Sequence, residues 1–230
     1  MVPIAANYRK IMDCISDAAA KSGRDLRQIR LLAAAKTQSA ESIRAAVEAG
    51  VRLVGENYVQ EAREVKTGFD LTVEWHMIGH LQRNKVRPAV ELFEVIETVD
   101  RADLARALDQ EGRKRGQAVR AFIEVNLAGE QSKSGIAKAG AGELVRQVGE
   151  LSFLRVEGLM TVPPLRADPG DARRYFRELR ELRDELQKLT MANVELRELS
   201  MGMTHDYPIA IEEGATIVRI GTALFGPRGT

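Results

Sequence analysis

The sequence predicts a single (β/α)8 barrel over residues 1–230, with one extra helix before the first strand. Short apolar or β-branched runs recur at intervals of roughly 26 residues, about the length of one strand–helix unit, and the segments between them have helical periodicity. No Gly/Ser-rich or Pro-rich tract divides the chain, so we expect one domain.

A doubly wound open sheet is the competing fold. Its first strand would lead into G-x-G-x-x-G if it bound a dinucleotide, because the glycines let the backbone approach the pyrophosphate. This chain instead has Ala33-Ala34-Ala35-Lys36-Thr37-Gln38 at that point. We therefore favour the barrel. The eight predicted strands are 29–35, 52–54, 74–78, 93–98, 121–125, 156–160, 195–200 and 216–220.

The helices are predicted from their apolar faces and their ends. A helix over 4–22 precedes the first strand, and we expect it to plug one end of the barrel. Ser39 is predicted to cap a helix that stops at Gly50, and Asp100 to cap one that runs to Gly116. We expect the longest helix at about 171–189. Thr204 is predicted to cap the helix whose first turn contains Pro208.

Composition excludes several classes of protein. Lys and Arg total 34 against 33 Asp and Glu, so no global field favours nucleic acid. A single cysteine, Cys14, rules out an internal disulfide, and the three scattered histidines do not have the spacing of a metal site. The longest aliphatic run, 31–35, is too short to span a bilayer, and Met1-Val2-Pro3-Ile4 does not resemble a secretory signal. We expect a cytoplasmic monomer.

Lys36 is the first candidate for chemistry, because the active face of a barrel lies at the carboxyl ends of its strands. Lys36 ends a wholly apolar strand and has no acidic neighbour in sequence. Desolvation there disfavours the ammonium form, and a neutral amine is what Schiff-base formation with an aldehyde needs. A lysine that merely extends from a strand end to water is the alternative.

Two bends after the last two strands are the second candidate. The bends Ser200-Met201-Gly202-Met203-Thr204 and Arg219-Ile220-Gly221-Thr222 combine hydroxyl groups with glycines, and barrel enzymes often hold a phosphate between these two loops. Ordinary strand-to-helix turns are the alternative. Together with Lys36 they indicate a ligand with an aldehyde and a phosphate, either pyridoxal phosphate or a phosphorylated sugar bound by a Schiff-base aldolase. Arg219 would then face the pyridine nitrogen, unless it serves in a salt bridge.

Seven motifs resemble one known family, the pyridoxal phosphate homeostasis proteins. They are Ala35-Lys36-Thr37, Gly55-Glu56-Asn57-Tyr58-Val59-Gln60-Glu61, the stretch 75–85, Ser132-Lys133-Ser134-Gly135, Gly158-Leu159-Met160-Thr161, the stretch 199–204 and the stretch 218–226. The family is related to the amino-terminal domain of alanine racemase. Two positions depart from its pattern: Thr204 replaces a serine, and Gln38 stands where many bacterial relatives have a second lysine.

The resemblance implies a barrel that holds pyridoxal phosphate as a Schiff base on Lys36 and serves in homeostasis of the cofactor, without established turnover. It implies Asn57 beside the cofactor ring and Arg219 at the pyridine nitrogen. It implies a phosphate cup made by Ser200, Met201, Gly202, Met203, Gly221 and Thr222. Apoenzymes that depend on the cofactor are the implied recipients.

A pyridoxal phosphate racemase or lyase is the alternative function. Racemisation needs a proton-transfer group on each face of the substrate's alpha carbon, and Lys36 supplies one. Tyr58 and Tyr207 are the tyrosines near the expected mouth, and packing is the commoner role for an aromatic ring at a loop. We therefore expect a carrier and not an enzyme.

Overall fold

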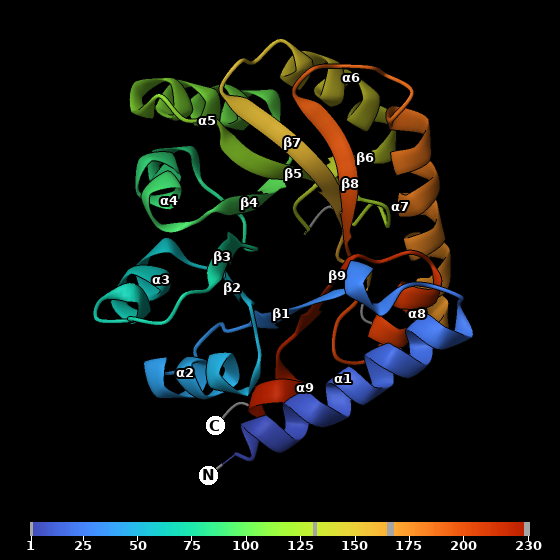
Figure 1. Cartoon of the computed structure of the whole chain (residues 1–230). Coiled ribbons are helices and arrows are strands. Elements are labelled where there is room, and N and C mark those ends of the chain that lie inside the picture. Colours follow the sequence, from blue (N-terminus) through green and yellow to red (C-terminus); the bar gives the residue numbers. More distant parts are fainter. Residues whose placement is uncertain (1, 131–132, 165–167, 228–230) are drawn as a thin grey trace.

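The computed structural model describes residues 2–130, 133–164 and 168–227. Within these residues eight parallel strands form a closed barrel surrounded by helices (Figure 1), since each strand pairs with the next and the last pairs with the first. In order around the barrel they are β1 (Arg30–Ala34), β2 (Leu53–Glu56), β3 (Glu74–Met77), β4 (Val95–Val99), β5 (Val119–Asn126), β7 (Leu154–Met160), β8 (Val194–Ser200) and β9 (Ile217–Ile220).

The barrel confirms the predicted fold class, and each of the eight predicted strands overlaps one barrel strand. One further strand, β6 (Ile136–Ala137), was not predicted; it pairs with the end of β5 at Val125 and Asn126. Two residues are too few to establish a period, so periodicity could not reveal it.

The helices lie outside the strands (Figure 1). They are α1 (Ile4–Lys21), α2 (Ala40–Ala49), α3 (Val59–Lys66), α4 (Val86–Leu92), α5 (Ala102–Arg115), α6 (Lys138–Gly149), α7 (Arg173–Leu186), α8 (Tyr207–Glu212) and α9 (Thr222–Phe225). Three short 3-10 helices cover Leu26–Gln28, Arg83–Lys85 and Pro169–Ala172.

Two predictions about the helices are wrong: the place of the first helix and which helix is the longest. α1 does not plug an end of the barrel: it lies along the outside and packs against α2, α8 and α9 (Figure 1). The helix that follows β9, α9, has four residues, so α1 fills the side of the outer ring that α9 is too short to cover. At 18 residues α1 is also longer than α7, which has 14.

Helix caps were predicted with mixed success. Ser39 does cap α2, because its hydroxyl accepts the Ser42 N–H at 3.3 Å, and the helix ends at Gly50 with a positive φ of 127°. Asp100 is not a cap: α5 begins at Ala102, and the Asp100 carboxylate pairs with Arg101 at 2.6 Å. Thr204 does not cap α8 either, since its hydroxyl accepts the Ala223 N–H at 3.3 Å.

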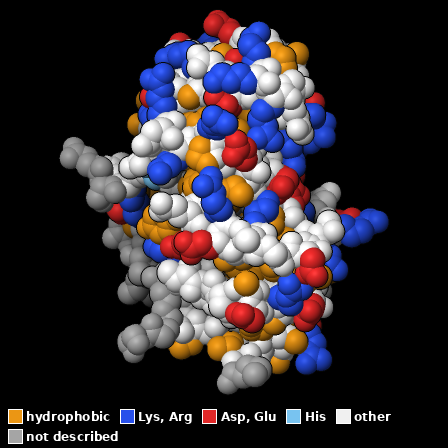
Figure 2. All heavy atoms as spheres, turned by 90° about the vertical axis from the view of Figure 1, so that its left-hand side faces the viewer, with side chains coloured by type: hydrophobic (Ala, Val, Ile, Leu, Met, Phe, Trp, Pro, Cys, Tyr) orange, Lys and Arg blue, Asp and Glu red, His pale blue; other side chains and the backbone are white. Residues whose placement is uncertain are grey.

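Apolar side chains form two layers. The larger lies between the strands and the helices. The smaller fills the barrel interior and consists of Leu32, Leu53, Val95, Phe122, Met160 and Ile217. On the face shown in Figure 2, over α3 to α5, acidic and basic side chains intermingle with small apolar areas. In the part of the chain that the structure describes, no helix is long and apolar enough to span a membrane.

Candidate functional site

A pocket of about 380 Å³ opens at the carboxyl ends of the barrel strands. Its walls come from five strand ends: β1, β2 and β3 on one side, β8 and β9 on the other, with Val162 after β7 between them. The residues that line it are Ala34, Lys36, Gln38, Asn57, Ile78, Val162, Met203, Thr204, His205, Arg219, Gly221, Thr222 and Gly226.

Most of the predicted site residues meet at this pocket. Of the nine, six line it: Lys36, Asn57, Met203, Arg219, Gly221 and Thr222. The other three, Ser200, Met201 and Gly202, do not line it. The fold therefore brings the lysine, the arginine and the second glycine bend together. The first bend contributes Met203 to the pocket lining, together with the two residues that follow it.

Lys36 stands at the rim of the pocket, directly after β1. Its side chain is half-buried and makes no ion pair with any residue that the structure describes. The amine Nζ lies 5.3 Å from the centre of the Tyr58 ring, which precedes α3 and is 51% exposed. An aromatic face attracts a cation without neutralising it, so the amine remains available to a ligand.

Arg219 forms the floor of the pocket and is buried inside the barrel. One guanidinium nitrogen donates to the carbonyl and hydroxyl oxygens of Ser200, both at 2.7 Å, and the other donates to the Thr161 carbonyl at 2.7 Å. Burial lowers the pKa of Arg219, whereas the charges of Glu97, Glu124 and Asp206 act against that shift. Three hydrogen bonds fix the orientation of the group.

A buried polar network supports Arg219 from below. The Ser200 hydroxyl donates to Glu97 at 2.5 Å, and Glu97 lies 2.6 Å from His76 Nδ1. Burial works against the charged form of both groups, but their contact outweighs it. The contact with His76 lowers the pKa of Glu97. The contacts with Glu74 and Glu97 raise the pKa of His76. A buried charge is tolerated only when it is paired and hydrogen-bonded, and this network meets that condition for Glu97.

These contacts explain why the first glycine bend does not face the pocket. The Ser200 hydroxyl is already shared between Glu97 and Arg219. Gly202 has a φ of +91°, and a Cβ there would lie 2.5 Å from the Ala210 Cβ, so the close approach that requires glycine is to α8. The Met203 N–H donates to Asp206 at 2.6 Å.

The second bend has its open side toward the pocket. Gly221 follows β9 and immediately precedes α9, whose first N–H groups have no partner within the helix. A Cβ on Gly221 would lie 3.3 Å from the Ala34 carbonyl oxygen, at the pocket wall. The exposed Thr222 places a hydroxyl group beside this bend.

The ionisable side chains that line the pocket are all basic: Lys36, His205 and Arg219. No acidic side chain among the described residues lines it, and the nearby Asp206 carboxylate accepts the Met203 N–H. A pocket with this lining suits an anionic ligand. Separately, the described residues contain no cluster of three or more His, Cys, Asp or Glu side chains that could hold a metal ion.

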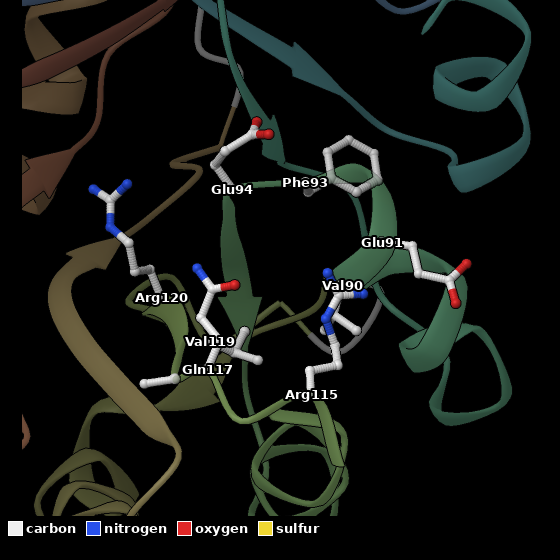
Figure 3. Close-up of a pocket in the computed structure, with 9 residues that line it drawn as sticks. Val90, Glu91, Phe93, Glu94, Arg115, Gln117, Val119 and Arg120 are labelled. Carbon is white, nitrogen blue, oxygen red and sulfur yellow. The ribbon is translucent and has the colours of Figure 1, made fainter. Parts of the chain in front are cut away.

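A second pocket lies at the opposite, amino end of the barrel (Figure 3), between the connections that lead into β4 and β5. Its volume is about 260 Å³, and Arg115, Arg120, Glu91 and Glu94 are among its lining residues. Arg120 is paired with Glu74 at 2.6 Å and with Glu157 at 2.9 Å. With mixed charges and no lysine amine or glycine bend, this pocket does not match the predicted chemistry.

Sequence reasoning missed several residues of the site. Ile78 and Val162 supply apolar walls, and nothing distinguishes them from other apolar residues in the sequence. Glu97 and His76 had a usable signal: each follows an apolar residue within its strand, at a position whose alternation points into the barrel. Their partners, however, lie on other strands and could not be identified without the fold.

The chain is similar to known proteins over almost its whole length. Residues 4–229 match the family model of the alanine racemase N-terminal domain. The chain is 44% identical to a pyridoxal phosphate homeostasis protein of Aquifex aeolicus over 220 residues, 95% of this chain and 96% of that one. It is 42% identical to the protein of the same name in Pseudomonas aeruginosa, over 99% of this chain and 97% of that one.

Solved structures show the same likeness. PipY of Synechococcus elongatus, solved with pyridoxal phosphate bound, superposes with a TM-score of 0.82 at 34% identity, covering 93% of this chain and 100% of PipY. Alanine racemase of Clostridium difficile shares the fold alone, with a TM-score of 0.69 at 12% identity, and this chain covers 57% of it.

The fold and the matched model define the class as a barrel of the alanine racemase N-terminal type. Within that class the chain belongs to the pyridoxal phosphate homeostasis protein family.

Proposed function

We propose that this protein binds pyridoxal phosphate in the pocket at the carboxyl end of the barrel, through the amine of Lys36, and acts in homeostasis of that cofactor. The observation that carries the proposal is a lysine without an ion pair in a pocket whose other ionisable lining groups are also basic. The names of the curated relatives and the ligand of PipY support it.

The residues present fit the cofactor. The pocket volume of about 380 Å³ is within the range typical of small-molecule sites. The phosphate is expected beside Gly221 and Thr222, where the lack of a side chain leaves the wall open at the amino end of α9. In this proposal Met203 and Thr204 form the adjoining wall, while Ser200, Met201 and Gly202 support the cup from behind.

When bound, pyridoxal phosphate supplies an aldehyde that condenses reversibly with a primary amine and releases water. Lys36 contributes the amine from a fixed turn at the rim. Arg219 directs a permanently charged guanidinium at the pocket floor, so a ring nitrogen placed against it is kept unprotonated. Asn57, which follows β2 and lines the pocket, is expected beside the ring.

The positions of the tyrosines favour a carrier over a racemase. Tyr207 is buried in α8 and does not line the pocket, and burial raises the pKa of its hydroxyl, so it is a poor proton donor or acceptor for a ligand there. Tyr58 lies on the same side as Lys36, with its ring near the lysine amine. In this proposal neither tyrosine serves as an acid–base partner opposite Lys36, and the protein holds the cofactor for transfer to apoenzymes.

Reductive trapping tests the proposed site. Protein mixed with pyridoxal phosphate and treated with borohydride is expected to carry the cofactor mass on the peptide that contains Lys36, and to lose it in Lys36→Ala. Lys85→Ala is the matched control, because Lys85 lies near the same end of the barrel but does not line this pocket. Equal labelling of the wild type and Lys36→Ala would contradict the assignment.

A second assay separates carrier from enzyme. A carrier releases bound cofactor to an added apoenzyme, whose activity then rises, and it gives no sustained racemisation or elimination with free amino acids. Multiple turnovers that disappear in Lys36→Ala would instead establish a racemase or lyase. Sedimentation of the purified chain tests the expected monomer.

A further inference from the structure

The turn that carries Lys36 has an unusual backbone. Thr37 has a φ of +64°, and among the described residues it is the one non-glycine residue with a positive φ. The Gln38 N–H donates to the Ala35 carbonyl at 2.8 Å, so Lys36 and Thr37 are the two central residues of a tight turn. Positive φ at the second central residue is normally supplied by glycine, and a β-branched side chain is strained there.

Two residues of the α3 amino terminus contact this turn. The Thr37 N–H donates to Glu61 Oε2 at 3.1 Å, and Glu61 lies in the first turn of α3. Tyr58, which precedes that helix, places its ring 5.3 Å from the Lys36 amine. One short helix therefore touches both the reactive side chain and the backbone next to it.

The cap of α2 does not depend on this strained residue. The next residues, Gln38 and Ser39, lead into α2, which Ser39 caps independently through the Ser42 N–H. A strained residue persists only where its surroundings hold it, and such residues cluster at functional sites. Here the restraint that is visible on the Thr37 backbone N–H is the Glu61 carboxylate.

We propose that Glu61 is a positioning residue for Lys36: its hydrogen bond to the Thr37 N–H holds the strained turn and so directs the Lys36 amine into the pocket. The proposal rests on the function proposed above, in which Lys36 is the amine that meets the cofactor. Without the Glu61 acceptor, Thr37 relaxes to negative φ and the lysine loses its orientation.

Four variants test this role. Glu61→Ala removes the acceptor, and Glu61→Gln keeps an uncharged one. Thr37→Asn keeps the turn with less strain, because asparagine tolerates positive φ better than other non-glycine residues do. The fourth variant combines Glu61→Ala with Thr37→Asn. Glu64→Ala is the matched control, since Glu64 is exposed on the same helix and makes no ion pair with a described residue.

Pyridoxal phosphate affinity and borohydride trapping on Lys36 are the first readouts. We expect Glu61→Ala to weaken binding about tenfold, the size of effect expected for a lost hydrogen bond to a charged acceptor, and Glu61→Gln to weaken it less. Glu64→Ala should bind like the wild type. Thr37→Asn should bind at least as tightly as the wild type, and adding it to Glu61→Ala should restore most of the loss.

The second readout needs no cofactor. In the apoprotein, exchange of the Gln38 backbone amide hydrogen, whose bond to the Ala35 carbonyl closes the turn, should be faster in Glu61→Ala than in the wild type, and slower again in the double variant. Wild-type binding by Glu61→Ala, or a loss that Thr37→Asn does not reduce, would overturn the positioning role. If the wild type itself traps no cofactor on Lys36, the proposed function fails, and amide exchange still decides whether Glu61 holds the turn.

Discussion

The pocket has a rim and a floor that use their cations in opposite ways. At the rim, Lys36 is half-buried and makes no ion pair with a described residue. At the floor, Arg219 is buried and donates three hydrogen bonds to Ser200 and Thr161, while Glu97 lies beneath. In the proposed function this difference separates reactivity from rigidity: the lysine that would react is left without an ion pair, and the arginine is held in one orientation by three hydrogen bonds.

The strongest test of the comparison exchanges each cation for alanine. Arg219→Ala leaves the Glu97 carboxylate without a nearby guanidinium, and breaking a buried charge network in this way typically costs about 3–5 kcal/mol of unfolding free energy. Lys36→Ala should change it by less than about 0.5 kcal/mol, as for surface substitutions. Urea unfolding of both variants measures the difference. Equal stabilities would show that the floor is not held by its hydrogen bonds.

Glu56 is buried like Arg219 but, unlike Arg219, it has no partner among the described residues. Its two carboxyl oxygens accept no hydrogen bond from them. Burial, and then the charge of Glu61, raise its pKa to about 8. Between the unfolded value of 4.5 and about pH 8 the folded protein therefore holds this proton more tightly than the unfolded chain does. Stability should accordingly fall as the pH rises through that window.

We expect this loss to reach about 2–4 kcal/mol between pH 5 and pH 8, and to shrink clearly in Glu56→Gln. Glu124, whose pKa is raised to about 7 chiefly by burial, titrates in the same window. Glu124→Gln and the double variant are therefore the matched comparisons. Urea midpoints measured across the pH range provide the measurement, and a flat wild-type profile would argue against a buried neutral Glu56.

The two glycine bends offer a smaller contrast. Gly202→Ala forces a side chain onto a φ of +91° and against Ala210, so we expect a loss of about 2 kcal/mol of unfolding free energy. Gly221 has a negative φ of −107°, so Gly221→Ala should lower the unfolding free energy by less than about 1 kcal/mol. The added methyl group is instead expected to weaken pyridoxal phosphate binding about tenfold. Thermal unfolding and cofactor titration separate the two effects; similar profiles for both variants would refute the distinction.

Local pattern predicted much of the fold and part of the site. The eight barrel strands were predicted because short apolar runs at strand–helix spacing are a local signal, and Lys36 and Arg219 because they occupy strand ends. Caps were less predictable. Asp100 and Thr204 are good capping residues, yet each was drawn into another contact, with Arg101 and with the Ala223 N–H.

The sequence by itself determined the barrel, the order of its strands and the residues presented at their carboxyl ends, because periodicity and chain order act over short distances. Only the tertiary structure decided which of those residues share a pocket. It turned Gly202 toward α8 and Gly221 toward the pocket, joined Ser200 to Glu97 across the barrel, and placed Glu61 against the strained Thr37. Such contacts depend on closure of the barrel, which brings together side chains as far apart in sequence as Glu97 and Ser200.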